Sequence, residues 1–344
     1  MVVLWKLEMP TARGVHAWTP FFYTITKESE VLLMAQAFLT YDEQLDKLQT
    51  EKELSIPDLS YAKNILKQIS YYSLIDGYKE LFKPLRSGKY YYGVTFEEIY
   101  AFYLFDEELR SLFLKYILKV EQHMKSMVSY YFSEKYGENQ AGYLTDTNYN
   151  LNRKNNAQIQ RLVNSLAKSI ATPSQYKYIN HHANIYGNVP LWVATNALTF
   201  GQISKMYQYA TSDIRTKISK NYDNISEVQL HQLITVLARC RNVCAHGERL
   251  FNFHIRETIS DMPLHNKLQL PSQKGQYCIG KQDLFAVVIA LRYLIENDDF
   301  KHFKNTLTHL IKNVLKKCPH LTEDQLLKEM GFPKNWHKIT RYKK

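Results

Sequence analysis

Apolar residues recur along most of the chain at the three- and four-residue spacing that places them on one face of a helix. Residues 61–72 show the pattern clearly, with apolar side chains at Ile65, Leu66, Ile69 and Tyr72. A longer stripe follows between residues 109 and 120, in a helical region that we expect to end at Gly137. We find no run with the alternation of a half-buried strand, and no internal repeat. The pattern predicts an all-α fold.

Capping boxes, in which a Thr is followed three residues later by a Glu, mark two helix starts. Thr40 with Glu43 and Thr95 with Glu98 are such pairs, and each precedes an apolar run. The Asn-rich residues 137–158 are expected to be a loop, and residues 254–280, with two prolines, an irregular excursion. Further helices are expected over residues 159–170, from Pro190 onward, and over residues 225–246, 283–296 and 303–315.

The first 33 residues do not share this pattern. They show no sustained period, and Pro10, Gly14 and Pro20 interrupt them. We therefore expect residues 1–33 to be an irregular extension, with Met34 as the biological start. Residues 34–344 are then expected to form a single all-α domain.

The composition is that of a soluble globular protein, with 45% hydrophobic and 22% charged residues among 344. No stretch approaches the roughly 20 apolar residues of a membrane-spanning helix, so we expect no membrane partner. Four cysteines and no secretory signal are typical of a reduced, cytoplasmic protein. The net charge of +11 favours a polyanionic partner, and nucleic acid is the first candidate. The lack of a P-loop argues against NTP hydrolysis.

One segment, RCRNVCAHGERLFN at residues 239–252, carries the best candidate chemistry. It ends the helix expected over residues 225–246, and Gly247 is well placed to terminate that helix. At about 100° per residue, Arg241, Asn242 and His246 lie away from the core face. That face comprises Leu233, Val236, Leu237, Cys240, Val243 and Cys244. The opposite side also carries His231, Ile234, Thr235, Ala238 and Ala245, of which the small ones would allow another backbone to approach.

The spacing of the three polar residues points to a two-fold symmetric arrangement. Asn242 and His246 are four residues apart, so their side chains can touch. Arg241 and His246 splay by roughly 140° on an ideal helix, so one helix would aim them poorly at one atom. Two copies facing each other could place Arg241 of one chain near His246 of the other. We therefore expect a C2 homodimer.

These residues suit cleavage of RNA without a metal or other cofactor. His246 would move a proton, and Arg241 would stabilise the charge on the phosphorane formed when a 2′-hydroxyl attacks the adjacent phosphate. Asn242 would orient His246 or a phosphate oxygen. The expected products carry a 2′,3′-cyclic phosphate and a 5′-hydroxyl. Spacing alone favours the plainer interpretation that Arg and His are common near helix C-termini because the dipole attracts positive charge there.

A family resemblance changes this balance. The sequence Arg241-Asn242-Val243-Cys244-Ala245-His246 resembles the R-x4-6-H motif of HEPN ribonucleases, and the chain over about residues 36–337 looks like the AbiD/AbiF-type abortive-infection proteins of bacteria. One block, ISYYSLIDGY, is similar to the family's INYYRLSGY but has one extra residue before Gly77. The likeness rests on blocks at residues 39–45, 69–78, 96–110, 190–201 and 330–336.

The resemblance implies an all-α, HEPN-like helical bundle with additional helices and a homodimer. It also implies RNA cleavage during phage infection by an endoribonuclease toxin, with a small structured RNA that restrains or guides it. The catalytic residues that it carries over are Arg241, Asn242 and His246.

Other features allow alternative interpretations. Cys240, Cys244, His246 and His254 could suggest zinc, but their spacing fits no usual finger, and buried free cysteines are the better interpretation. His181, His182, Tyr176 and Tyr178 could stack on RNA, but exposed loop residues are the better interpretation. Glu121, His123 and Lys125 lie on an expected helix that we could not place relative to the motif. Phosphates could be held by Lys312, Lys316 and Lys317 or by Lys338, Arg341, Lys343 and Lys344, although a solvated helix face and a frayed terminus explain them equally well.

Two hypotheses from different classes remain after the resemblance is considered. The first is a metal-independent endoribonuclease. The second is a non-catalytic RNA-binding module, in which Arg241 and His246 grip a phosphate without cleaving the chain. A helix that serves only dimerisation is a third possibility, and it predicts no affinity for RNA.

Overall fold

The computed structural model describes residues 38–342 and is all-α, as the sequence predicts. The expectations for residues 1–33, Met34, Lys343 and Lys344 fall outside the described residues. The α-helices are α2 (Tyr41–Thr50), α3 (Leu59–Gln68), α4 (Phe96–Tyr136), α5 (Gln140–Leu144), α6 (Asn156–Ser169), α7 (Lys177–Tyr186), α8 (Leu191–Ala194), α9 (Phe200–Tyr209), α10 (Ser212–Ser219), α11 (Glu227–Ala245), α12 (Pro263–Lys267), α13 (Leu284–Leu294), α14 (Asn297–Lys317) and α15 (Glu323–Glu329). Short 3-10 helices cover Lys79–Phe82, Asp146–Asn148, Thr195–Ala197 and Trp336–Arg341.

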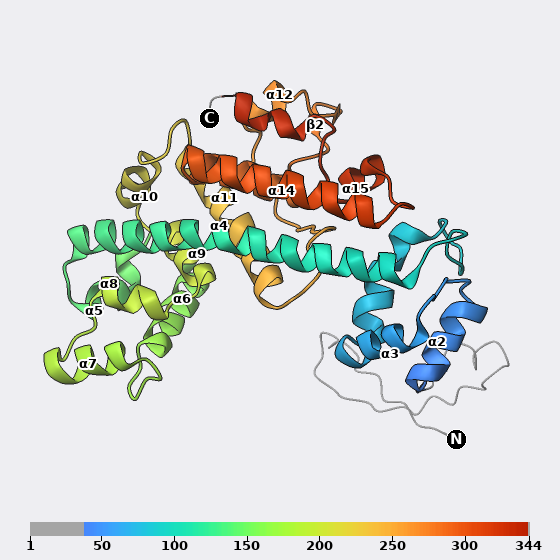
Figure 1. The fold of residues 1–344 in the computed structure, drawn as a ribbon. Coiled ribbons are helices and arrows are strands. Elements are labelled where there is room, and N and C mark those ends of the chain that lie inside the picture. The colour runs from blue at the N-terminus through green and yellow to red at the C-terminus, as the bar shows by residue number, and fades with distance from the viewer. Residues whose placement is uncertain (1–37, 343–344) are drawn as a thin grey trace, which may run out of the picture.

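Helix α4 is the central support of the fold, and it crosses the molecule in Figure 1. Both predicted capping boxes are present, at Thr40–Glu43 for α2 and at Thr95–Glu98 for α4. Gly137 ends α4 with a φ of 81°, which only glycine adopts at little cost. One helix of 41 residues therefore connects the N-terminal helices with the lobe that contains α5 to α9.

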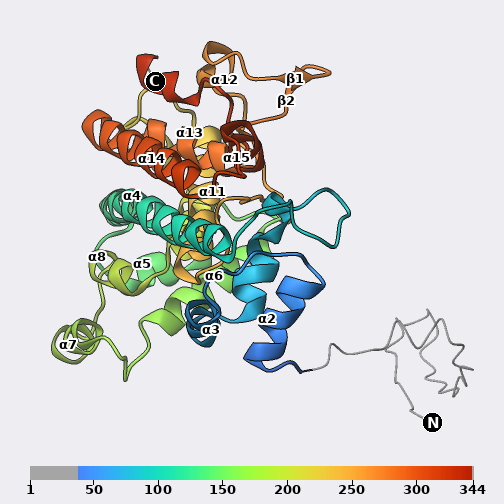
Figure 2. The same cartoon turned by 45° about the vertical axis from the view of Figure 1, so that its right-hand side comes forward.

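Helix α14 lies along α4 in the antiparallel direction, as Figures 1 and 2 both show. Polar contacts join the two ends of this packing: Lys119 forms an ion pair with Asp299 at 2.6 Å, and Nδ1 of His320, just beyond α14, lies 2.8 Å from Oε1 of Glu98. Between them the rings of Phe113 and Phe303 pack edge to face at 5.0 Å. Helix α14 begins earlier than expected, at Asn297.

Helix α13 is the centre of the core. All eleven of its residues are buried, as expected of a helix that is almost entirely apolar. Its one charged residue, Arg292, donates to Asn297 Oδ1 at 2.7 Å and to Tyr342 O at 3.0 Å. Helix α13 packs against α11 and α4, and α11 also contacts α9. The predicted motif helix is therefore held on three sides.

A π-helical turn over Tyr72–Asp76 accounts for the extra residue before Gly77. A π turn contains one residue more than an α turn, so it absorbs an insertion without displacing the chain that follows. Leu74 and Ile75 remain buried in this turn.

Two stretches expected to be irregular contain short elements. Residues 137–158 hold α5, a 3-10 turn and the first residues of α6. Residues 254–280 hold α12 and a small antiparallel hairpin, in which β1 (Ser272–Gln273) pairs with β2 (Gln276–Tyr277) and Ser272 lies opposite Tyr277. From Pro190 the chain forms the single turn of α8 and then the 3-10 turn Thr195–Ala197 before α9 begins at Phe200. Within residues 38–342, no helix has the length and apolar character needed to cross a bilayer.

Candidate active site at the end of helix α11

The predicted helix over residues 225–246 is α11, and its termination fixes the position of His246. His246 is the C-terminal cap, and Gly247 follows with a φ of 69°. The amide of Gly247 donates to Cys244 O at 3.4 Å, and the amide of Glu248 donates to Val243 O at 3.1 Å. These two bonds form a Schellman motif, so the predicted role of Gly247 is confirmed.

The predicted core face of α11 is confirmed and is wider than one stripe. Buried residues include Leu233, Val236, Leu237, Cys240 and Cys244, while Val243 is half-buried against the core. Ile234 and Ala238 were assigned to the opposite side with Arg241, but both are buried. Because α4, α9 and α13 all contact α11, three neighbours cover more of its surface than the sequence stripe suggests.

Arg241 forms an ion pair, but no hydrogen bond, with a buried carboxylate of α4. Its Nε lies 3.5 Å from Oε2 of Glu121, whose side chain is only 7% exposed. The other oxygen of Glu121 lies 2.9 Å from Nζ of Lys125, one turn further along α4. One buried negative charge is thus shared by two cations, and the Arg241 side chain remains 31% exposed beyond this contact.

Asn242 and His246 are exposed. Within the described residues, no hydrogen bond links their side chains to each other or to Arg241. Val228, Thr235 and Asn242 follow one another at intervals of seven residues, and they share with His246 one side of α11. Val228 at the start of this face is 61% exposed, which is unusual for an apolar side chain on a core helix.

The loop that follows His246 is tied to α4 through Asp106, which is fully buried. Its carboxylate accepts hydrogen bonds from the amides of Leu250 at 3.1 Å and Phe251 at 2.7 Å. It also accepts from the Tyr78 hydroxyl at 2.9 Å and from Arg110 at 2.7 Å. Burial raises the pKa of the Asp106 carboxyl. The charge of Arg110 and the hydrogen bonds from Tyr78, Leu250 and Phe251 act in the opposite direction. Asp106 therefore holds the chain just beyond Gly247.

Another histidine, His231, lies earlier in α11. His231 is half-buried, and burial lowers its pKa to about 4, with the nearby positive charges of Lys205 and Arg215 acting in the same direction. Its Nε2 lies 3.3 Å from the Thr235 hydroxyl. Near neutral pH His231 is therefore uncharged.

Cys240 and Cys244 are free and buried, as predicted. Burial raises the pKa of the Cys240 thiol well above its ordinary value. Residues 38–342 contain no group of three or more His, Cys, Asp or Glu side chains that could hold a metal ion.

Sequence reasoning left Glu121 unplaced and gave Asp106 no role. Glu121 and Lys125 stand four residues apart on one helix, and this pairing was the visible signal. Nothing in the local pattern connects them with Arg241, which lies far along the chain. His123 contacts a different residue, because its Nδ1 lies 3.3 Å from the Tyr222 hydroxyl.

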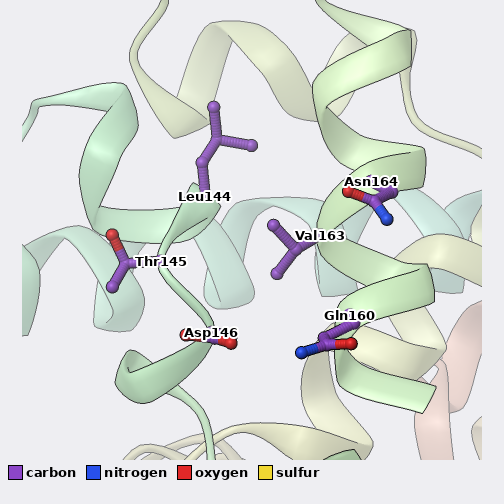
Figure 3. A pocket seen from close by; sticks show the side chains of 6 residues that line it. All are labelled: Leu144, Thr145, Asp146, Gln160, Val163 and Asn164. Carbon is purple, nitrogen blue, oxygen red and sulfur yellow. The ribbon is translucent and has the colours of Figure 1, made fainter. Parts of the chain in front are cut away.

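Two surface depressions of the described chain do not include the predicted site residues. Figure 3 shows an open depression between α5 and α6, lined by Leu144, Thr145, Asp146, Gln160, Val163 and Asn164. A second depression, beside α4, is lined by Ser126, Ser129, Tyr130, Ser133, Glu134, Glu138 and Trp192. Neither includes Arg241, Asn242 or His246; Asn242 and His246 are exposed, whereas Arg241 is half-buried.

A family model described as Abi-like protein matches residues 64–252, which extend from α3 to just beyond Gly247 and include all three predicted site residues. Searches of curated proteins and of solved structures found no match.

Proposed function

This chain belongs to the Abi-like protein family, and on that premise we propose that it is an abortive-infection endoribonuclease of the HEPN type. The observation that carries the proposal is the end of α11. There an Arg that pairs with a buried carboxylate lies five residues before an exposed His, and no side chain among residues 38–342 is bonded to that His. The proposed substrate is RNA, and a small structured RNA is proposed to restrain or guide the enzyme.

The proposed reaction needs only proton transfer and charge stabilisation. The 2′-oxygen of one nucleotide attacks the adjacent phosphorus, and the bond from phosphorus to the 5′-oxygen breaks. A base removes the 2′-hydroxyl proton, and an acid gives a proton to the departing 5′-oxygen. His246 is the proposed proton carrier. The products are a 2′,3′-cyclic phosphate and a 5′-hydroxyl.

Arg241 is the proposed ligand of the phosphate. Glu121 approaches its Nε, which leaves the two terminal nitrogens of the guanidinium for phosphate oxygens. A fixed cation stabilises the charge that develops on the phosphorane better than a mobile one, because it needs no reorganisation during the reaction. Asn242, exposed beside it, is proposed to orient His246 or a phosphate oxygen.

A homodimer is proposed because the two catalytic groups point in different directions on the same helix. Arg241 turns toward α4, whereas His246 is exposed at the helix end. A second copy packed on the face of Val228, Thr235 and Asn242 would place His246 of each chain opposite the other chain. The exposure of Val228 supports this face as the contact.

Cleavage assays on the purified full chain test the proposal. Labelled RNA is incubated in EDTA with the wild type, with Arg241→Ala/His246→Ala, and with Arg239→Ala. Arg239 is a suitable control because it is an exposed Arg of the same helix, paired with Glu257 at 2.8 Å. We expect cleavage by the wild type and Arg239→Ala, cyclic-phosphate ends, and no cleavage by the double variant.

Sequencing of RNA that co-purifies with the protein tests the small-RNA partner. The alternative, an RNA-binding module without catalysis, predicts bound RNA but no cleavage by any of the three proteins after that RNA has been removed. Cleavage that stops in EDTA would contradict the proposed mechanism.

A further inference from the structure

A long internal segment of the chain has no negative side chain. From Thr147 to Ser212 the sequence contains no Asp or Glu, but it contains two Arg and four Lys. This segment, here called the basic lobe, includes α6, α7, α8 and α9. Its basic residues are Arg153, Lys154, Arg161, Lys168, Lys177 and Lys205. None of their side chains forms an ion pair with a carboxylate among residues 38–342.

Two basic residues outside the lobe, one on α4 and one on α10, are paired with carboxylates. Lys135 meets Asp213 at 2.8 Å, and Lys217 meets Glu134 at 2.6 Å. Both pairs use residues outside the basic lobe. Within the described residues, the positive charge of the lobe is therefore not cancelled by ion pairs, and Asp146, which lines a depression with Gln160 and Asn164, is a neighbouring acid.

Helix α6 presents part of this charge in a regular array. Arg161 and Lys168 are exposed and seven residues apart, so they share one face and stand about 10 Å apart along the axis. The exposed Asn164 lies between them. Arg153 and Lys154 precede the helix, and Lys177 begins α7; all three are exposed. A flexible polyanion could lie along the α6 face of Arg161 and Lys168.

Helix α7 adds exposed rings. His181, His182 and Tyr186 form a cluster in which the ring centroids lie 5.3–5.9 Å apart. Tyr186 and its neighbour Ile185 are each 65% exposed. These residues lie on a helix, so the expectation of an exposed loop was wrong for His181 and His182. Helix α7 contacts α8 and lies at the edge of the molecule in both Figure 1 and Figure 2.

We propose that the basic lobe binds single-stranded RNA. The unpaired Arg and Lys side chains hold phosphates, and the ring cluster of α7 stacks on unpaired bases. Rings can stack only on bases that are not already paired, so this chemistry selects a single strand over a duplex. An acidic protein would satisfy the charge but would leave the rings of α7 without their counterpart.

The proposed RNA surface is separate from α11. It shares with the proposed function the premise that the ligand is RNA, but it does not require cleavage. Lys205 lies on α9, and α9 packs against α11, so this helix connects the two regions. An RNA strand held on the lobe would thus be adjacent to the helix that carries Arg241 and His246.

Binding measurements on the full chain test the proposal. The protein carries Arg241→Ala and His246→Ala so that cleavage cannot interfere. The probe is a fluorescein-labelled single-stranded RNA of about 16 nucleotides, the upper end of the length that one single-strand-binding domain covers. Its anisotropy is measured at several salt concentrations, against competing duplex RNA, an acidic peptide and vesicles containing anionic lipid.

Two variants with equal charge change separate the lobe from general electrostatics. Arg161→Gln/Lys168→Gln/Lys177→Gln should weaken binding at least about tenfold and reduce the salt slope by about 2, since each phosphate contact contributes about 0.7. The control, Lys312→Gln/Lys316→Gln/Lys317→Gln on α14, should weaken it by less than about threefold. Equal losses in the two variants would overturn the proposal.

A second pair of variants tests stacking. Tyr186→Ala should weaken binding at least about fivefold, whereas Tyr186→Phe should keep the wild-type affinity. No effect of Tyr186→Ala, or tighter binding to duplex RNA, to the peptide or to the vesicles, would also overturn the proposal. Cleavage by the protein with Arg241 and His246 intact is scored separately, so RNA binding by the lobe without cleavage would reject only the proposed function.

Discussion

Oε2 of Glu121 lies 3.5 Å from Nε of Arg241, and it joins the predicted phosphate ligand to the middle of the longest helix in the molecule. The carboxylate is buried, so its position is set by the packing of α4 against α11. The orientation of Arg241 therefore depends on a residue from another helix. Several predictions about the site and its support can be tested separately.

Replacing Glu121 should slow cleavage strongly and lower the free energy of unfolding only moderately. In Glu121→Gln the charge that holds Arg241 is lost, and we expect cleavage at least about tenfold slower. Unfolding should become easier by about 1–3 kcal/mol, because Lys125 loses its buried partner while Arg241 can turn toward solvent. Cleavage rate and thermal unfolding are measured together. Lys125→Gln keeps the Glu121–Arg241 contact, and it should retain most of the cleavage; equal losses in both variants would argue against the anchoring role.

Asp106 should be essential for stability. Asp106→Asn leaves Arg110 without its charge partner and weakens the bonds to the amides of Leu250 and Phe251. We expect the free energy of unfolding to fall by about 3 kcal/mol, as for one partner removed from a buried pair. Urea denaturation measures this change. Glu107→Gln, at an exposed neighbour, should change it by less than about 0.5 kcal/mol.

Gly247→Ala should be destabilising through the backbone alone. Gly247 has a φ of 69°, and an added Cβ would meet no atom within 4 Å, so only conformational strain opposes it. We expect a loss of about 1 kcal/mol. Gly201→Ala is the matched control, because Gly201 lies in α9 and its added Cβ would come 3.8 Å from the Thr199 hydroxyl, an ordinary contact. That change should stabilise the protein by about 0.5 kcal/mol, and a neutral result at both sites would contradict the assignment.

Acid should destabilise the protein through His231. Its pKa in the folded chain is lowered from 6.5 to about 4, so the unfolded chain takes up the proton first as the pH falls. The contribution of His231 is fully present above pH 6.5 and is lost between that value and about pH 4. The expected loss is about 2 kcal/mol after allowance for partial solvent screening. Denaturation curves at a series of pH values measure it, and His231→Gln should show a weaker dependence over the same interval.

The elements that depend on neighbouring residues were predictable from the sequence. Thr95 with Glu98 starts α4, and Gly137 and Gly247 end α4 and α11, because caps act within one turn. The burial of Cys240 and Cys244 followed from helical period.

Features that depend on distant residues were not predictable in this way. The contact between Glu121 and Arg241 joins α4 to α11, and no local periodicity reports on it. Ile234 was misplaced for a similar reason, since the number of helices around α11 decides how much of its surface is buried. The π turn at Tyr72–Asp76 is a feature of the backbone conformation, and the side-chain pattern does not report it.

The chain has four cysteines, and Cys278, beside the small hairpin, is the exposed one; Cys240, Cys244 and Cys318 are buried. Burial raises the pKa of Cys318 to about 12 and that of Cys240 well above its ordinary value, so these two thiols remain protonated and unreactive at neutral pH. A maleimide dye or spin label should therefore react at a single position without any engineered substitution. In a homodimer the native protein would carry one probe on each chain, and the distance between the two probes would report directly on assembly.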